Sequence, residues 1–140
     1  MTRETCPEDT ILPKASEMDM SQPVLIVDDD PNLQRLMTKF LKLEGFSSVP
    51  TSNGREALNY LRAGGDAGVI LLDLRMPVMD GWAFRREQRS IPSLAQIPVI
   101  VLTGIEGEHV RDLGAAAAFS KPISFPEVVG VVRRLCEHES

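Results

Sequence analysis

Short apolar runs alternate five times with segments of helical periodicity along most of this chain. The apolar runs predict five strands, at 24–27, 47–50, 69–73, 98–103 and 117–120. The segments that follow them predict five helices, at 31–44, 54–63, 81–89, 108–113 and from 124 onward. Five strand–helix repeats imply parallel strands joined by right-handed crossovers. The predicted fold is therefore a single doubly wound α/β module, a five-stranded parallel sheet with helices on both faces.

Two of these helices have clear signals at their ends. Asp30 is placed to cap the first helix, Pro31 suits its first turn, and Gly45 suits the residue after its end. The run VVGVV near the C-terminus has the composition of a strand. However, Ser124 and Glu127 form a capping box ahead of it, and its apolar residues recur with helical spacing. A helix is therefore predicted there.

The composition is that of one globular domain with an acidic leading segment. The 140 residues carry fifteen Lys and Arg against twenty Asp and Glu, a net charge of −5. This charge leaves no basic footprint for nucleic acid, and no apolar run reaches the roughly 18 residues that span a bilayer. The N-terminus lacks the apolar region of a signal peptide, and the two cysteines form no disulfide or zinc framework. We therefore expect a cytoplasmic protein with a flexible tail at 1–22 and one domain at 23–138.

Polar side chains gather where the predicted strands end. Asp28 and Asp29 follow the first strand, Asp73 ends the third, Thr103 ends the fourth, and Lys121 follows the fifth. The carboxyl ends of parallel strands meet at one edge, where α/β sheets bind ligands. Carboxylates this close require a cation, and Mg²⁺ prefers oxygen ligands and phosphate. A magnesium ion and a lysine together neutralise charge on a transferring phosphoryl group. This edge is therefore predicted to be a phosphoryl-transfer site, with a carboxylate as nucleophile.

Four motifs in this order, VLIVDDDPN, LLDLRMPVMDG, PVIVLTG and SKP, resemble those of bacterial response regulator receiver domains. The resemblance covers nearly everything after the tail and implies the strand order 2-1-3-4-5. It also implies that a histidine kinase or phosphotransfer protein donates a phosphoryl group to Asp73. By the same resemblance, Asp28, Asp29 and the backbone carbonyl of Arg75 join Asp73 in binding Mg²⁺. Thr103 and Lys121 would then contact the phosphoryl group.

Two features depart from the usual receiver pattern. Ala118 stands where the family usually has an aromatic residue, and strand alternation points the neighbouring Phe119 to the opposite face. Thr103 and Lys121 are only 18 residues apart, which predicts a shortened fourth helix around 107–113. In the family that aromatic ring reorients when the threonine moves, so this coupled switch is in question here. Receivers commonly present the fourth helix, fifth strand and fifth helix to their partners, and the shortened helix puts that output surface in question as well.

Arginines are prominent near the predicted acceptor and in the third helix. Arg75 lies two residues after Asp73, where its cation is expected to shield the phosphoryl group from water. In the third helix Phe84 is followed by the run RREQR, which we interpret as a solvated face rather than a basic patch.

The leading hypothesis is a stand-alone receiver that signals through an unidentified protein partner and catalyses only its own phosphorylation and dephosphorylation. One alternative is a degenerate receiver that docks to partners without regard to phosphorylation. Another is a small phosphatase of the haloacid-dehalogenase type with Asp28 as nucleophile, because the chain also resembles its sparse motifs at Asp28, Asp30, Thr103 and Lys121. A flavin-binding protein is disfavoured, because the first strand–helix loop presents three acids where donors to a cofactor phosphate are needed.

Overall fold

The computed structural model describes residues 22–104 and 113–139, and within them all five predicted strands form one parallel sheet. The order is β3-β2-β4-β5-β6, which is 2-1-3-4-5 counted along the chain. Each predicted strand lies within one residue of its observed bounds. The strands are β2 (Val24–Val27), β3 (Ser48–Thr51), β4 (Val69–Asp73), β5 (Val99–Thr103) and β6 (Ala117–Ser120).

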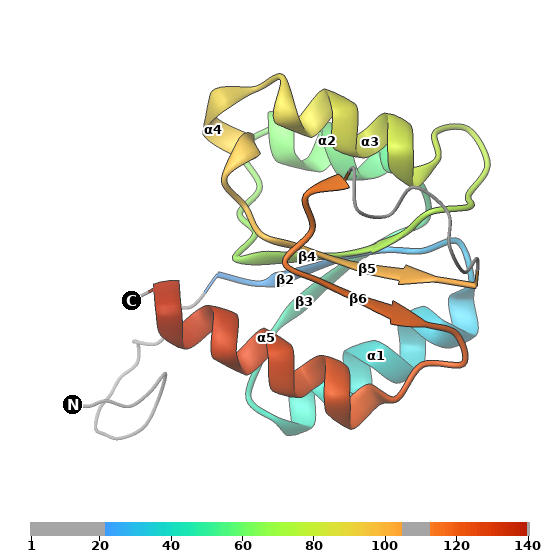
Figure 1. The fold of residues 1–140 in the computed structure, drawn as a ribbon, viewed down its shortest axis with the longest axis vertical. Helices are drawn as coiled ribbons and strands as arrows, with labels where there is room; N and C mark the ends of the chain where they lie inside the picture. Colours follow the sequence, from blue (N-terminus) through green and yellow to red (C-terminus); the bar gives the residue numbers. More distant parts are fainter. Residues whose placement is uncertain (1–21, 105–112, 140) are drawn as a thin grey trace.

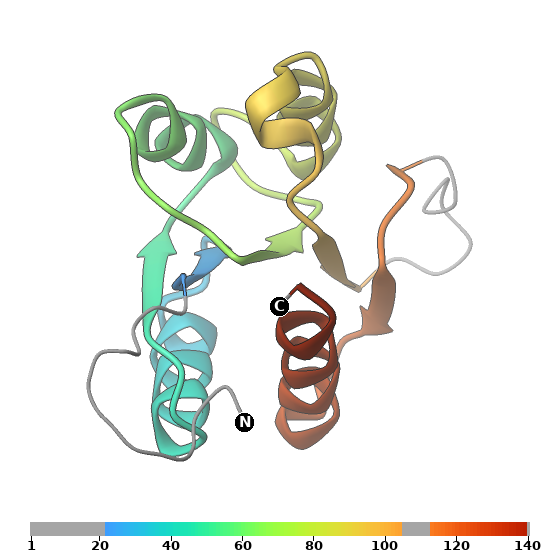
Figure 2. The ribbon, with the colours of Figure 1, turned by 90° about the vertical axis from the view of Figure 1, so that its left-hand side faces the viewer.

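Helices cover both faces of the sheet, as Figures 1 and 2 show. One face is covered by α2, α3 and α4, and the other by α1 and α5. Alternate residues of β2 supply the two cores: Leu25 and Val27 pack on the α2/α3 side, whereas Val24 and Ile26 pack on the α1/α5 side. The helices are α1 (Pro31–Leu43), α2 (Gly54–Arg62), α3 (Gly81–Arg89), α4 (Pro92–Ala95) and α5 (Phe125–Glu139).

The structure confirms the end signals of α1. The Asp30 side chain accepts a hydrogen bond from the backbone N–H of Asn32, and Pro31 occupies the first turn. Gly45 follows the helix with φ +91°, a left-handed conformation that glycine adopts without strain. The C-terminal run VVGVV is helical, as predicted, because its apolar face packs against the core shared with α1.

One observed helix was not predicted, and one predicted helix lies almost wholly beyond the described residues. The short helix α4 was not predicted, because it has four residues and no apolar period of its own. The helix predicted at 108–113 lies almost wholly outside the described residues. Within the described part of the chain, no helix is long and apolar enough to cross a membrane.

The prediction of a solvated face after Phe84 was wrong for two residues, Arg85 and Gln88, which are buried. The Arg85 guanidinium donates to Leu113 O at 2.7 Å and to Gln88 Oε1 at 2.8 Å. The Gln88 amide in turn donates to Leu94 O at 2.8 Å. These bonds satisfy the buried donors, so two polar side chains here join α3 to α4 and to the start of the β6 segment.

The prediction for β6 was correct. Phe119 is half-buried and packs against the core on the α1/α5 side, whereas Ala118 points the other way and is exposed. Among the described residues, the position three before Lys121 therefore holds the methyl group of Ala118 rather than an aromatic ring.

Val78 has φ +68° in the loop between β4 and α3, a conformation that is strained for a β-branched residue. Its side chain is 78% exposed, so it contributes little burial. We predict that Val78→Asn stabilises the protein by about 1 kcal/mol, because asparagine tolerates a positive φ better than a β-branched residue does. Urea unfolding measures this, with Val78→Thr as the β-branched control that is expected to remain near the parent. Equal stability of the Asn and Thr variants would contradict the prediction.

Candidate functional site

Three carboxylates meet at the carboxyl edge of the sheet. Asp28 directly follows β2 and is fully buried, Asp73 ends β4 and is 4% exposed, and Asp29 faces solvent. One carboxylate oxygen from each lies within 4.8 Å of the others. The parallel register places them together, because β2 and β4 pair side by side from Val24 and Val69 onward. The structure thus brings together the three acids that the sequence predicted to share this edge.

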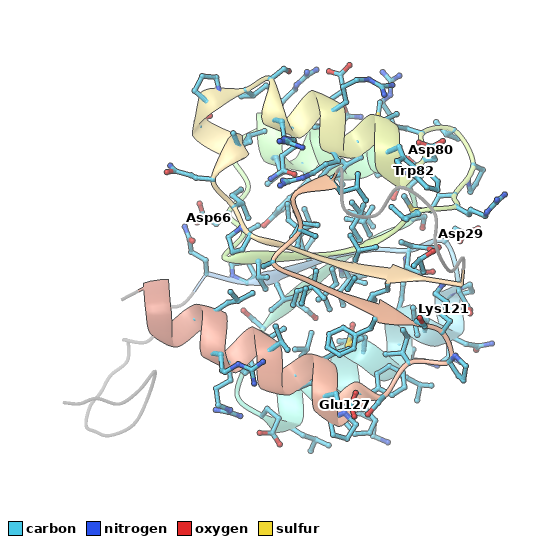
Figure 3. The ribbon with its side chains drawn as sticks, in the orientation of Figure 1. Asp29, Asp66, Asp80, Trp82, Lys121 and Glu127 are labelled. Carbon is cyan, nitrogen blue, oxygen red and sulfur yellow. The ribbon has the colours of Figure 1, made fainter. Side chains whose placement is uncertain are left out.

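Lys121 reaches into this cluster from the end of β6. Its Nζ lies 3.3 Å from Asp28 Oδ2 and 3.4 Å from Asp73 Oδ2. Its backbone N–H donates to Thr103 O at 2.8 Å, which continues the β5–β6 pairing past the last strand residue. Figure 3 shows Lys121 and Asp29 at the same end of the molecule, although 92 positions separate them in sequence. One ammonium therefore bridges acids from two different strands.

Thr103 and Arg75 occupy the same edge in different ways. Thr103 is the last residue of β5 and is buried, next to the strand that ends in Asp73. Arg75 lies two residues beyond Asp73 with its side chain exposed.

Asp30 is the cap of α1, as predicted, and it also donates its backbone N–H to Asp28 Oδ1 at 2.9 Å. This bond helps to fix the orientation of the Asp28 carboxylate.

Sequence reasoning missed two residues that position Asp28. The Gln34 amide donates to Asp28 O at 2.7 Å and to Thr51 O at 2.9 Å, which ties α1 to the ends of β2 and β3. The Thr51 hydroxyl donates to Ile26 O at 2.8 Å. One signal was available for Gln34: it lies three residues before Met37 and seven before Leu41, both buried, so helical spacing places it on the inner face of α1.

Gly81 is a third positioning residue that the sequence did not reveal. Its backbone N–H donates to Leu74 O at 2.9 Å, which holds the start of α3 against the end of β4. A Cβ on Gly81 would lie 2.4 Å from Asp73 O and 2.8 Å from Leu74 Cα. Only glycine allows this close approach, so the backbone that carries Asp73 is fixed by direct contact with α3.

The site holds an excess of negative charge, which shifts the ionisation of its groups. Burial and the negative charge of Asp28 raise the pKa of Asp73 to about 6, and Lys121 offsets only part of this. Burial also raises the pKa of Asp28. Burial alone would lower the pKa of Lys121, but attraction to the two acids outweighs it and raises that pKa. Three acids beside one lysine form a donor set that suits a hard divalent cation such as Mg²⁺.

A comparison with family models decides what kind of domain contains this edge. Residues 24–133 match the model of the response regulator receiver domain. The chain belongs to this family. Receiver domains are signalling modules of two-component systems rather than classical enzymes, and the phosphatase and flavin readings of the sequence are left without support.

Two relatives resemble the chain over most of its length. The regulatory protein AtoC of Escherichia coli is 36% identical over 121 residues, which is 84% of this chain but only 26% of AtoC. The polar-differentiation response regulator DivK of Brucella anthropi is 30% identical over 81% of this chain and 95% of DivK. The chain thus spans about a quarter of one relative and nearly all of the other.

The receiver fold is also seen among solved structures. The response regulator TrrA of Thermotoga maritima, solved in complex with Mg²⁺–BeF, is 27% identical to this chain. It superposes with a TM-score of 0.72, and the match covers 82% of this chain and 99% of TrrA. The five-stranded order and the arrangement of helices described above are therefore those of a receiver domain.

Proposed function

We propose that this receiver accepts a phosphoryl group on Asp73 from a histidine kinase or a histidine phosphotransfer protein. The observation that carries the proposal is the Lys121 ammonium within 3.4 Å of both Asp28 and Asp73, in a cluster of three carboxylates. A site of this composition suits a transferring phosphoryl group, because opposite charges are held ready around the reacting atoms. A module whose only role was docking would not need a buried acid cluster with a bridging lysine.

The reaction is a displacement at phosphorus. A carboxylate oxygen of Asp73 attacks, the new O–P bond forms, and the P–N bond to the donor histidine breaks with its electron pair returning to the imidazole. Lys121 pairs with the phosphoryl oxygens once Asp73 has become an acyl phosphate. The Thr103 hydroxyl donates a hydrogen bond to one of those oxygens. These two residues hold the product in place.

Asp28, Asp29, Asp73 and the backbone carbonyl of Arg75 are the groups that would hold Mg²⁺. When bound, the ion supplies positive charge that offsets the negative charge developing on the transferring phosphoryl group. Support comes from the carboxylate cluster and from the relative TrrA, which was solved with Mg²⁺–BeF. Beryllofluoride mimics a phosphoryl group, so that complex combines the two ligands that this proposal requires.

We also propose that the chain acts as a stand-alone receiver whose output passes through a protein partner. Its alignment with 95% of DivK supports this architecture. The acidic net charge offers no footprint for nucleic acid, which favours protein recognition as the output.

Incubation with acetyl phosphate and Mg²⁺, followed by intact-mass measurement, tests the proposed function. The parent is expected to gain the mass of one phosphoryl group, and Asp73→Asn is expected to gain none. Glu127→Gln, a substitution of an exposed acid on α5, is the matched control and should behave like the parent. A parent that gains no mass would favour the docking alternative. Incorporation that survives Asp73→Asn but is lost in Asp28→Asn would favour the phosphatase reading.

Arg75 is predicted to lengthen the life of the phosphorylated state, because its exposed cation lies beside the acceptor loop. We expect the acyl phosphate on Asp73 to hydrolyse about two- to fivefold faster in Arg75→Ala than in the parent. This is the range of an exposed charge interaction. Loss of the added mass over time measures this rate. Arg134→Ala, which removes an exposed arginine on α5, is the control. A rate equal to or slower than that of the parent would contradict the role given to Arg75.

A further inference from the structure

An apolar strip runs along α1, and the described residues cover it only in part: Leu33 and Phe40 pack against the core shared with α5, whereas Leu36 and Leu43 stay exposed. Four residues form it, and we call them the α1 seam: Leu33, Leu36, Phe40 and Leu43. Leu36 is 45% and Leu43 is 73% exposed. The spacings of three, four and three residues are those of the a and d positions that bind a second helix or an extended apolar segment. Phe40 is held in place by stacking on Phe125 of α5, with ring centroids 5.0 Å apart.

One flank of the seam is purely basic. Arg35, Lys39 and Lys42 are exposed on the same side of the helix, and α1 contains no acidic residue. Lys39 and Lys42 form no ion pair with any residue in the part of the chain that the structure describes. An apolar strip beside unpaired cations suits a segment that is both apolar and acidic. It disfavours a second copy of α1, whose cations would repel these.

Residues 1–21 of the same chain have that composition. The segment contains five acids and two bases, a net charge of −3 in a chain whose total is −5. Its apolar residues concentrate where the acids do: Ile11 and Leu12 follow Asp9, and Met18 and Met20 alternate with Glu17 and Asp19. The segment thus offers apolar side chains that match the α1 seam and carboxylates that match its basic flank.

The segment also joins the domain near the correct end of α1. Val24 donates its backbone N–H to Ser47 O at 2.9 Å, and Ser47 lies four residues beyond Leu43, the last residue of α1. The 21 residues span up to about 70 Å when extended. A helix the length of α1 is about 20 Å long. The reach is therefore ample for the segment to run along the whole seam.

We propose that residues 1–21 bind back onto the α1 seam. The methionines and Ile11–Leu12 cover Leu36 and Leu43, and Glu17 and Asp19 pair with Lys39 and Lys42. This contact occupies a face that a helical partner of the same apolar and acidic character needs, so such a partner has to displace the segment. The inference does not depend on phosphorylation of Asp73, and it predicts that the contact weakens as salt screens the charges.

The native cysteines provide the test. In full-length Cys136→Ala, a nitroxide spin label on Cys6 broadens the amide NMR signals of residues close to the leading segment. We expect the signals of 36–43 to lose most of their intensity, while those of α2 on the opposite face keep theirs. Lys39→Glu with Lys42→Glu should remove this loss, and adding Glu17→Lys with Asp19→Lys should restore it.

Three outcomes would overturn the proposal. The first is unaffected α1 signals in the labelled parent. The second is a loss of intensity that persists unchanged in Lys39→Glu/Lys42→Glu. The third is a loss that disappears on dilution, because contact within one chain does not depend on concentration, whereas contact with a second copy does. Dispersed spectra of the variants show that each is folded, so none of these results is attributable to unfolding.

Discussion

The free energy of unfolding of the Gly81→Ala variant is expected to be about 3 kcal/mol lower than that of the parent, which is the upper end of the range for overpacking. The added Cβ would lie 2.4 Å from Asp73 O and 2.8 Å from Leu74 Cα. Both obstacles are backbone atoms at the end of β4, the central strand of the sheet, so no side chain can rotate away. Either α3 moves outward or the peptide that follows Asp73 is displaced. The variant should therefore also accept phosphate more slowly from acetyl phosphate.

The same substitution in α5 provides a control with the opposite sign. A Cβ on Gly130 meets no atom within 4 Å, and the residue lies inside a helix. Gly130→Ala is therefore expected to stabilise the protein by up to about 1 kcal/mol, the difference in helix propensity. Urea unfolding of both variants measures the contrast. Similar stabilities for the two alanine variants would show that contact with β4 does not determine the need for glycine at position 81.

Most of the fold followed from local sequence signals. Buried runs such as VILLD at 69–73 predicted strands, and residues such as Asp30 and Gly45 marked the helix ends. The site edge was also predictable, because acids that follow two parallel strands must end on the same side of the sheet. Each of these inferences uses either residues that are neighbours in sequence or the common direction of parallel strands. None requires knowledge of a specific tertiary contact.

Two of the missed features, the burial of Arg85 and the close approach of Gly81, depend on tertiary contacts. Arg85 is separated from Leu113 by 28 positions, yet the carbonyl of Leu113 satisfies its buried guanidinium. From sequence alone, the run RREQR is indistinguishable from a solvated helix face. Gly81 likewise reads as an ordinary helix start after Asp80, until the structure places it against Asp73 O. Polar burial and close backbone approach are set by the partner, and a single sequence does not name the partner.

Asp73→Asn is expected to make the protein more stable than the parent at pH 7.5 without Mg²⁺, by about 1–3 kcal/mol. The parent's Asp73 has a pKa of about 6 in the folded state against 3.8 in the unfolded chain. Below the unfolded value both states are protonated and the group costs nothing. As the pH rises through this interval the unfolded chain ionises first, so the parent loses stability until the folded carboxyl also ionises. The shift of about two units corresponds to about 3 kcal/mol as an upper bound.

Two controls separate this electrostatic effect from a change in packing. At pH 4 the advantage of Asp73→Asn should fall to well under 1 kcal/mol, because the folded carboxyl is then neutral and the unfolded one is only about half ionised. At pH 7.5 saturating Mg²⁺ should stabilise the parent more than the variant, since a ligand that binds only the folded state adds stability that grows with the logarithm of its concentration over its dissociation constant. Urea unfolding at the two pH values, with and without Mg²⁺, measures both effects. An advantage for asparagine that is constant with pH would mean that burial of negative charge beside Asp28 does not govern this site.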